Sequence, residues 1–194
     1  DELNTINQKV SEITENTLDT IVSNRGQYRY SNKIYEDYPV EMQKISDRRI
    51  ASNAFQNLPN LFTDEKPNDG EEYIQIFGRF DNERSYKWFK RAYLSEPNNF
   101  PRYKVILPKA NGSGAIGEVL STPLIGEPLI GFTETFISIG SFDNELEAQN
   151  AMKYIKSKFA RTMLGVLKIT QDNTKEKWRK VPLQNFTAES DIDW

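Results

Sequence analysis

The sequence predicts an α+β fold, in which a mixed or antiparallel sheet occupies the middle of the chain and helices flank it. Two observations support this prediction. Residues 72–94 contain two runs rich in aromatic and β-branched side chains, joined by Asp81-Asn82-Glu83, a pattern typical of a β-hairpin. Residues 144–168 instead repeat apolar side chains at the spacing of a helix. The chain therefore combines strands and helices in separate segments, as α+β folds do.

The remaining elements follow the same patterns along the chain. Apolar residues at helical spacing predict a helix over residues 4–22, and three prolines break residues 24–70 into irregular structure. Strands are expected over residues 103–107 and 131–142. Asp143 is the expected N-cap of the helix that follows, because acidic residues come directly after it. The apolar face of that helix is expected to comprise Ala148, Met152, Ile155, Phe159, Met163 and Val166.

The composition shifts the expected function from catalysis toward binding. The 194 residues include no His and no Cys, which excludes imidazole bases, thiol nucleophiles and nearly all zinc chemistry. The absence of Cys also excludes a disulfide framework and fits a cytoplasmic protein. No apolar run reaches the roughly 20 residues of a membrane span, so no membrane partner is expected.

The two ends of the chain suggest a piece of a longer protein. The chain starts at Asp1 without an initiator Met or a signal peptide, and it stops at Trp194 without a polar tail. We expect residues 1–23 to be a helix or connector from an upstream region, and residues 24–194 to form one domain.

Basic residues are concentrated in two segments although the net charge is −3. Residues 84–109 hold seven Lys or Arg against Glu96 alone, and residues 153–180 hold nine against Asp172 and Glu176. Such segments are either solvated faces or parts of a nucleic-acid footprint, since Lys and Arg that neutralise phosphates supply most nonspecific affinity.

Three short motifs allow more than one interpretation. Residues 112–117 match G-x-G-x-x-G, but Pro123 follows and no helix does, so this segment is a loop, with or without contact to a nucleic-acid backbone. The acid-x-Lys match at Asp64-Glu65-Lys66 is a weak nuclease signal, and the chain has no Pro-Pro pair of the kind that grips a flipped base. Trp178, within the basic run 175–180, is either a stacking platform or a core residue.

Several segments together resemble a known family. They occur in the order Arg102-Tyr-Lys-Val-Ile-Leu-Pro-Lys109, Thr133 to Phe142, Ala148 to Ala160, Thr170-Gln171 and Val181-Pro-Leu-Gln-Asn-Phe186. In this order they resemble the C-terminal target-recognition (specificity) region of bacterial type II restriction-modification enzymes with an adenine-specific DNA methylase domain. The resemblance covers residues 100–194, is thin over 20–35 and is absent over 36–99.

The resemblance implies a bacterial, cytoplasmic, sequence-specific double-stranded DNA recognition domain without chemistry of its own. Its partners would be DNA and the upstream methylase and nuclease domains of the same polypeptide. S-adenosylmethionine and Mg²⁺ are expected in those upstream domains, and no cofactor is expected in the present chain. Because recognition domains diverge where they read bases, residues 36–99 are expected to hold base-reading side chains.

Lys and Arg side chains with loop N–H groups would contact phosphates, and polar loop side chains would read base edges in the major groove. Two other functions stay open: a protein-docking module that uses the 72–94 hairpin, and a metal-dependent nuclease that uses acids such as Glu71, Glu72 or Asp81. The candidate DNA-binding residues are Arg25, Arg29, Lys87, Lys104, Lys109, Asn111, Ser113, Lys156 and Lys158.

Overall fold

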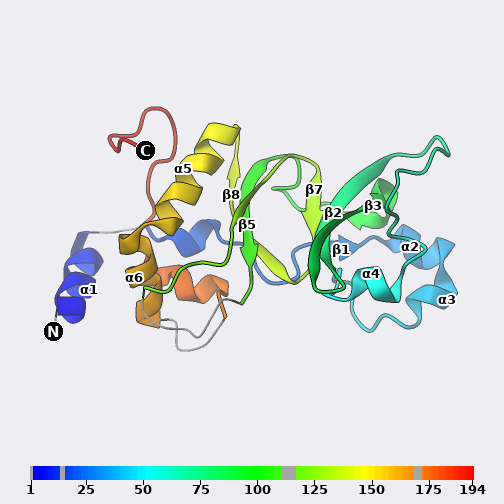
Figure 1. Cartoon of the computed structure of the whole chain (residues 1–194), viewed down its shortest axis with the longest axis horizontal. Helices are drawn as coiled ribbons and strands as arrows, with labels where there is room; N and C mark the ends of the chain where they lie inside the picture. Colours follow the sequence, from blue (N-terminus) through cyan, green and yellow to red (C-terminus); the bar gives the residue numbers. More distant parts are fainter. Residues whose placement is uncertain (1, 14–15, 111–116, 168–171) are drawn as a thin grey trace. The chain divides into compact units, whose positions relative to one another are not determined.

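The computed structural model describes residues 2–13, 16–110, 117–167 and 172–194, and it confirms the α+β class. The chain divides into two compact units (Figure 1). Unit 1 consists of Asp1–Asn24, Arg102–Glu127 and Ile137–Trp194, and unit 2 consists of Arg25–Pro101 and Pro128–Phe136. The predicted domain over residues 24–194 thus contains all of unit 2 and most of unit 1.

Unit 1 is a three-stranded sheet covered by helices. The strand order is β6-β5-β8, and β5 pairs with β6 in antiparallel register, with Lys104 opposite Gly126. Helix α5 packs on β5 and β6, and α6 packs on η3 (Figure 1). The elements are α1 (Glu2–Ile13), η1 (Leu18–Ile21), β5 (Tyr103–Pro108), β6 (Leu124–Gly126), β8 (Phe136–Phe142, whose first residue belongs to unit 2), α5 (Glu145–Lys156), α6 (Lys158–Leu167) and η3 (Lys175–Lys180).

Unit 2 contains a second three-stranded sheet, in the order β3-β2-β7, and a short β1-β4 pair. Strands β2 and β3 form an antiparallel hairpin, whereas β2 and β7 are parallel. Asp81 and Asn82 turn the hairpin with φ of 48° and 66°, as two-residue turns of this hand require. The elements are β1 (Arg29–Tyr30), α2 (Asn32–Asp37), α3 (Pro39–Met42), α4 (Ala54–Asn57), β2 (Tyr73–Phe80), β3 (Glu83–Lys90), η2 (Arg91–Tyr93), β4 (Leu94–Ser95) and β7 (Ile130–Phe132).

The predicted hairpin and the strand at 103–107 are confirmed, but the strand predicted over 131–142 is wrong as one element. It is two strands, β7 and β8, that belong to different sheets. Between them the backbone N–H of Thr133 donates to Phe77 O, and that of Glu134 donates to Ile50 O. Alternating side chains along residues 131–142 indicate that both segments are extended, but they do not indicate that the chain passes from one sheet to another.

The helix predicted over 144–168 is also two elements. Helix α5 ends at Lys156, Ser157 is extended (φ −62°, ψ 152°), and its hydroxyl accepts a hydrogen bond from the Ala160 N–H at 3.1 Å. Ser157 therefore ends one helix and caps the next. This break resets the helical register, so Phe159 is 42% exposed. The prediction that Phe159 belongs to the apolar face in the core is therefore wrong.

The N-cap prediction at Asp143 is wrong by one residue. The side chain of Asn144 accepts from the Glu147 N–H at 3.0 Å, and Asn144 has the extended backbone of a cap. The N-terminal helix is shorter than the predicted 4–22, because α1 ends at Ile13 and a separate 3₁₀ turn, η1, begins at Leu18. Among the described residues, the helices are too short or too polar to cross a membrane.

Candidate nucleic-acid interface

Unit 2 carries a polar pocket of about 240 Å³ whose lining combines hydrogen-bond donors and acceptors. In the recess beside β4, Arg91 is bound by Glu72 at 2.7 Å and Glu96 at 2.5 Å, whereas the polar pocket adds to its own paired arginine three exposed polar side chains, Lys44, Asn53 and Asn57, that have no side-chain partner among the described residues. The polar pocket is therefore the better candidate for a ligand. Its lining residues are Lys44, Ile45, Ser46, Asp47, Arg49, Ala51, Asn53, Asn57 and Glu134.

The segment between α3 and α4 forms one side of this pocket and is fixed by backbone hydrogen bonds. The Tyr30 N–H donates to Arg48 O at 2.7 Å, and the Ile50 N–H donates to Tyr28 O at 3.0 Å. Ile50 is fully buried, so it anchors the segment in the core of unit 2. These bonds and the buried side chain fix the segment in place, which suits a surface that must present side chains in one geometry.

Arg49 is the most constrained side chain in the pocket. Its Nε donates to Asp47 Oδ2 at 2.6 Å, and its Nη2 lies 2.6 Å from the same oxygen. Asp47 Oδ1 also accepts from the Arg49 backbone N–H at 2.9 Å. The hydrogen bond from Arg49 lowers the pKa of Asp47, and the hydrogen bond to Asp47 together with the charge of Glu134 raises the pKa of Arg49. Both groups are therefore charged at neutral pH.

A glycine makes room for the Arg49 stem. Gly26 has φ of +66°, and a Cβ built there would lie 2.2 Å from Arg49 Cδ. Only glycine combines that backbone conformation with this close approach.

Glu134 also lines the pocket, with its side chain 13% exposed. Its Oε1 is 3.4 Å from Arg25 Nη2, and its Oε2 is 3.2 Å from Arg49 Nη1. The angles at Oε2 do not make a hydrogen bond, so this buried oxygen accepts none from the described residues. An unused acceptor beside a cationic donor is the arrangement that a polar ligand or a water would complete.

Three further lining side chains are not used by the fold. Lys44, Asn53 and Asn57 are exposed, and among the described residues none of their side chains has an ion pair or hydrogen bond. Asn53 occupies the N-cap position of α4, yet its side chain makes no capping bond. Their amide and ammonium groups therefore remain available to a ligand.

The predicted candidates in unit 2 divide between this region and the core. Arg25 reaches Glu134, and the charge of Arg29, exposed on β1, helps to lower the pKa of Asp47. Lys87, in contrast, is buried, with Nζ 2.5 Å from Asp64 and 4.6 Å from the centre of the Phe80 ring. Since the Lys87 side chain is only 8% exposed, its ammonium does not present a surface to DNA.

The candidates in unit 1 also divide. Lys104 is fully buried and donates to Arg102 O at 2.9 Å and Glu127 O at 3.3 Å, so it cannot reach a phosphate. Burial lowers its pKa to about 8. Lys109 is half-buried, and its carbonyl accepts from the Asn173 N–H at 2.6 Å. Asn111 and Ser113, with most of the glycine-rich segment, lie outside the described residues.

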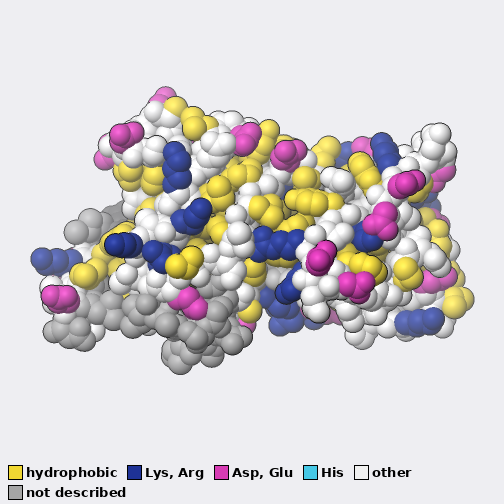
Figure 2. Space-filling model, viewed as in Figure 1, with side chains coloured by type: hydrophobic (Ala, Val, Ile, Leu, Met, Phe, Trp, Pro, Cys, Tyr) yellow, Lys and Arg dark blue, Asp and Glu magenta, His cyan; other side chains and the backbone are white. Residues whose placement is uncertain are grey.

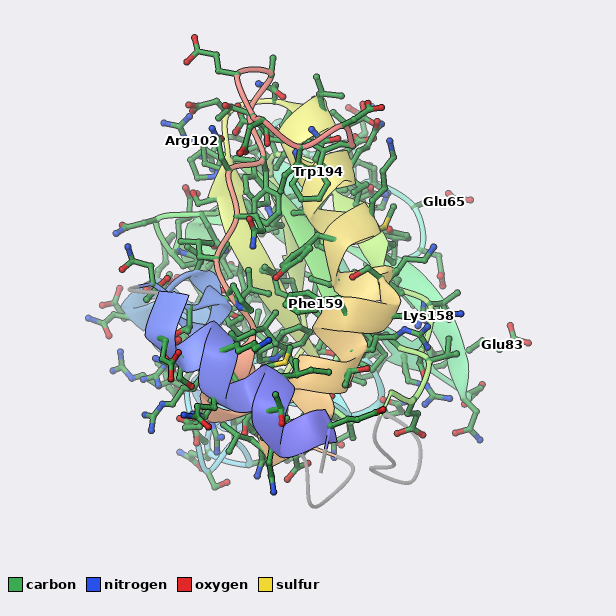
Figure 3. The ribbon with its side chains drawn as sticks, turned by 90° about the vertical axis from the view of Figure 1, so that its left-hand side faces the viewer. Glu65, Glu83, Arg102, Lys158, Phe159 and Trp194 are labelled. Atoms are coloured by element: carbon green, nitrogen blue, oxygen red, sulfur yellow. The ribbon has the colours of Figure 1, made fainter. Side chains whose placement is uncertain are left out.

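Lys156 and Lys158 are exposed on either side of Ser157, where α5 meets α6. Figure 2 shows several Lys and Arg side chains along α5 and α6, and Figure 3 shows Lys158 and Phe159 projecting on different sides of the junction. Neither ammonium forms an ion pair with a described residue. They are the predicted lysines best placed to meet a polyanion.

The two remaining motif interpretations can be compared with the structure. Trp178 is fully buried and its Nε1 donates to Asn173 O at 3.1 Å, so it is a core residue and the stacking interpretation is wrong. Glu71 pairs with Lys90 at 3.0 Å, and Glu72 pairs with Arg91. In the described part of the chain, acidic residues do not gather in groups of three that could hold a metal ion.

Sequence reasoning missed the pocket itself, including Arg49, Asn53 and Asn57. The one signal available was the run Asp47-Arg48-Arg49, in which an acid two residues before an arginine can bind its guanidinium. That run lies in the stretch 36–99 where base-reading residues were expected, but nothing local indicated which arginine would be fixed.

A scan of known protein families, a search of curated proteins and a search of solved structures each find no match to this chain.

Proposed function

We propose that this chain is the double-stranded DNA target-recognition region of a type II restriction-modification enzyme and performs no chemistry itself. The observation that supports this most is the division into units. The resemblance to recognition regions covers residues 100–194, which supply most of unit 1, whereas unit 2 contains the whole stretch 36–99 where the resemblance is absent. A family scaffold and a divergent reading surface would be separated in this way.

The two units would then have different roles. In unit 1, the exposed lysines at the α5–α6 junction, with Lys109 nearer the sheet, would contact phosphates and so supply affinity that does not depend on sequence. In unit 2, the polar pocket would supply contacts to base edges, because Arg, Lys and Asn side chains match the acceptors and donors of the major groove.

The proposed partners are DNA and the methylase and nuclease domains expected upstream in the same polypeptide. S-adenosylmethionine and Mg²⁺ belong, in this proposal, to those upstream domains in a bacterial cytoplasm. The described side chains of the pocket are donors and acceptors, without a nucleophile and base in contact, which fits recognition better than catalysis.

A titration of the whole chain against a mixed-sequence duplex of about 30 base pairs tests the proposal, at low and at moderate salt. We expect binding at low salt that weakens steeply with added salt, toward a nonspecific Kd of about 10⁻⁴ to 10⁻⁶ M. Loss of DNA binding at both salt concentrations would overturn the proposal and favour the protein-docking function. In a second experiment, the whole chain is incubated with plasmid and Mg²⁺. We expect the plasmid to stay intact, and cleavage would favour the nuclease function.

A further inference from the structure

Arg49 has the geometry of a side chain fixed in advance for one contact. Its stem lies against Gly26, its Nε and Nη2 are held by Asp47, and its Nη1 faces Glu134 at 3.2 Å. Arginine otherwise loses about 2 kcal/mol of rotamer entropy when it is ordered by a ligand. Here the fold has already ordered the side chain, so a ligand would bind it at little entropic cost.

The guanidinium nevertheless keeps donors for a ligand. Of the five N–H groups that an arginine carries, three face Asp47 and Glu134. Two N–H groups on the Nη atoms therefore have no partner among the described residues, and the side chain is one-third exposed at the pocket. Donors on the two Nη atoms of one planar group can meet a pair of acceptors on one edge of a ligand.

From these contacts we infer that Arg49 is a specificity-determining residue that donates to O6 and N7 of one guanine in the major groove. Guanine is the base that presents two adjacent acceptors there, and an arginine is its commonest partner. Asp47 and Glu134 are positioning residues that fix the plane of the guanidinium. This inference rests on the proposed function, because it assumes that unit 2 meets duplex DNA.

The neighbouring charges favour a base contact at Arg49 over a phosphate contact. Asp47 and Glu134, the second of which also pairs with Arg25, place two carboxylates beside the Arg49 guanidinium. A phosphate at this guanidinium would lie close to both negative charges, whereas a guanine edge is neutral and needs only directed donors. Arg48 differs in this respect: its guanidinium lies 5.2 Å from the Tyr35 ring centre and donates to Asn32 Oδ1 at 2.6 Å, and it has no acid partner among the residues that the structure describes. Arg48 is therefore a matched control for loss of one positive charge.

The experiment selects bound sequences from a library of duplexes with a randomised core of about 12 base pairs, using the whole chain. Wild type should enrich a motif that includes an invariant guanine. Arg49→Ala and the charge-preserving Arg49→Lys should both lose the preference at that position and bind the wild-type motif about 5- to 100-fold more weakly. Asp47→Asn should weaken the same preference, and Arg48→Ala should leave the motif unchanged.

Base analogues locate the contact atom. Replacing the invariant guanine by 7-deazaguanine removes the N7 acceptor, so it should weaken wild type but have no further effect on Arg49→Ala. Inosine keeps O6 and N7, so it should bind wild type like guanine. Circular dichroism melting of each variant confirms folding, and Arg49→Lys replaces Arg49→Ala if the latter does not fold.

The outcomes separate this inference from the proposed function. A wild-type motif without an invariant guanine, or an Arg49→Lys motif identical to that of wild type, would overturn the role of Arg49 and leave DNA recognition intact. Failure of wild type to bind any duplex at low salt would overturn the proposed function itself.

Discussion

Unit 1 buries mainly aliphatic side chains and one tryptophan beneath two helices, whereas unit 2 buries mainly aromatic rings among short elements. In unit 2 the Phe62 and Phe89 rings are stacked with their centroids 4.6 Å apart, and the ring centroids of Phe77 and Phe136 are 4.5 Å apart. In unit 1 the α5 and α6 residues Ile155 and Met163 are fully buried. Large rings fill space where short helices and loops supply little regular packing, so unit 2 can carry irregular loops on a firm core.

The buried charges differ in the same way. In unit 2, buried Lys87 is paired with Asp64, and Glu134 lies between two arginines. In unit 1, Lys104 donates to carbonyls, and burial lowers its pKa. The buried charges of unit 2 are thus paired with opposite charges, while unit 1 carries a buried cation at an energetic cost.

The largest expected effect comes from removing the central aromatic side chain of either core. Trp178→Ala in unit 1 and Phe89→Ala in unit 2 remove fully buried rings, and each should cost about 3–5 kcal/mol of unfolding free energy. Hydrogen exchange should show lost amide protection in the altered unit and retained protection in the other. Phe159→Ala, at an exposed ring, is the control and should change stability by less than about 0.5 kcal/mol. Equal loss of protection in both units would mean that they unfold as one.

The second prediction uses pH to distinguish the units. Lys104 has its folded pKa lowered to about 8 from 10.5, so the unfolded chain binds more protons between these values and the stability of unit 1 should rise with pH from about 8. The full gain in stability, reached above the unfolded pKa, is about 3–4 kcal/mol. Lys104→Met should abolish this rise in amide protection of unit 1. Stability that stays flat between pH 8 and 9.5 in wild type would contradict a buried, shifted lysine.

Unit 2 should show the opposite trend at higher pH. Burial raises the pKa of Tyr28 and Tyr30 well above its usual value, so the stabilising neutral forms are fully present below pH 10 and stability falls as pH rises further. Burial also raises the pKa of Tyr154 in unit 1 to about 12, so unit 1 loses stability above pH 10 as well. The two units are therefore compared between pH 8 and 10, where the stability of unit 1 should rise and that of unit 2 should stay level.

A third prediction concerns the glycine beneath Arg49. Gly26→Ala should cost about 1–2 kcal/mol and displace Arg49, because φ is +66° and the new Cβ would meet Arg49 Cδ. Gly70 has φ of +83° but no atom within 4 Å of a built Cβ, so Gly70→Ala carries the backbone strain alone. Thermal melts give the stability of each variant. Guanine preference in the library selection should fall for Gly26→Ala and persist for Gly70→Ala.

In both units the sequence predicted the local elements and missed the features that depend on distant contacts. The β2–β3 hairpin and β5 were predictable because alternation and turn residues are local signals. The change of sheet between β7 and β8 was not, since it depends on Thr133 and Glu134 bonding to distant carbonyls of Phe77 and Ile50. The helix break at Ser157 was missed for another reason: the apolar spacing of the sequence continues through it.

The candidate site shows the same limit. Arg25 and Arg29 were chosen for their charge, and both are exposed near the pocket. Lys87 and Lys104 were chosen for the same reason and are buried, because the fold, not the charge pattern, decides which lysines reach solvent. Asn53 and Asn57 carry no distinctive local pattern, and only the tertiary structure places them beside Arg49.

The smallest expected effect concerns the lysines of unit 1. Lys156→Ala and Lys158→Ala should each weaken binding a few-fold at every duplex sequence and flatten the salt dependence by about 0.9 unit per contact, because each lost phosphate contact releases one counterion fewer. Lys109→Ala should do the same if its ammonium contacts a phosphate. Lys153→Ala is the control, since its Nζ already donates to Trp194 O at 3.0 Å.

Fluorescence anisotropy over a range of salt concentrations measures these slopes for a selected motif and for an unrelated duplex. If unit 1 contacts only phosphates, the lysine variants shift both titrations equally and leave the ratio of the two affinities unchanged. A change in that ratio would assign sequence readout to unit 1 as well, and the division of roles between the units would no longer hold. An unchanged slope for all three variants would place the α5–α6 junction and Lys109 away from the DNA, leaving unit 2 as the DNA-contacting part.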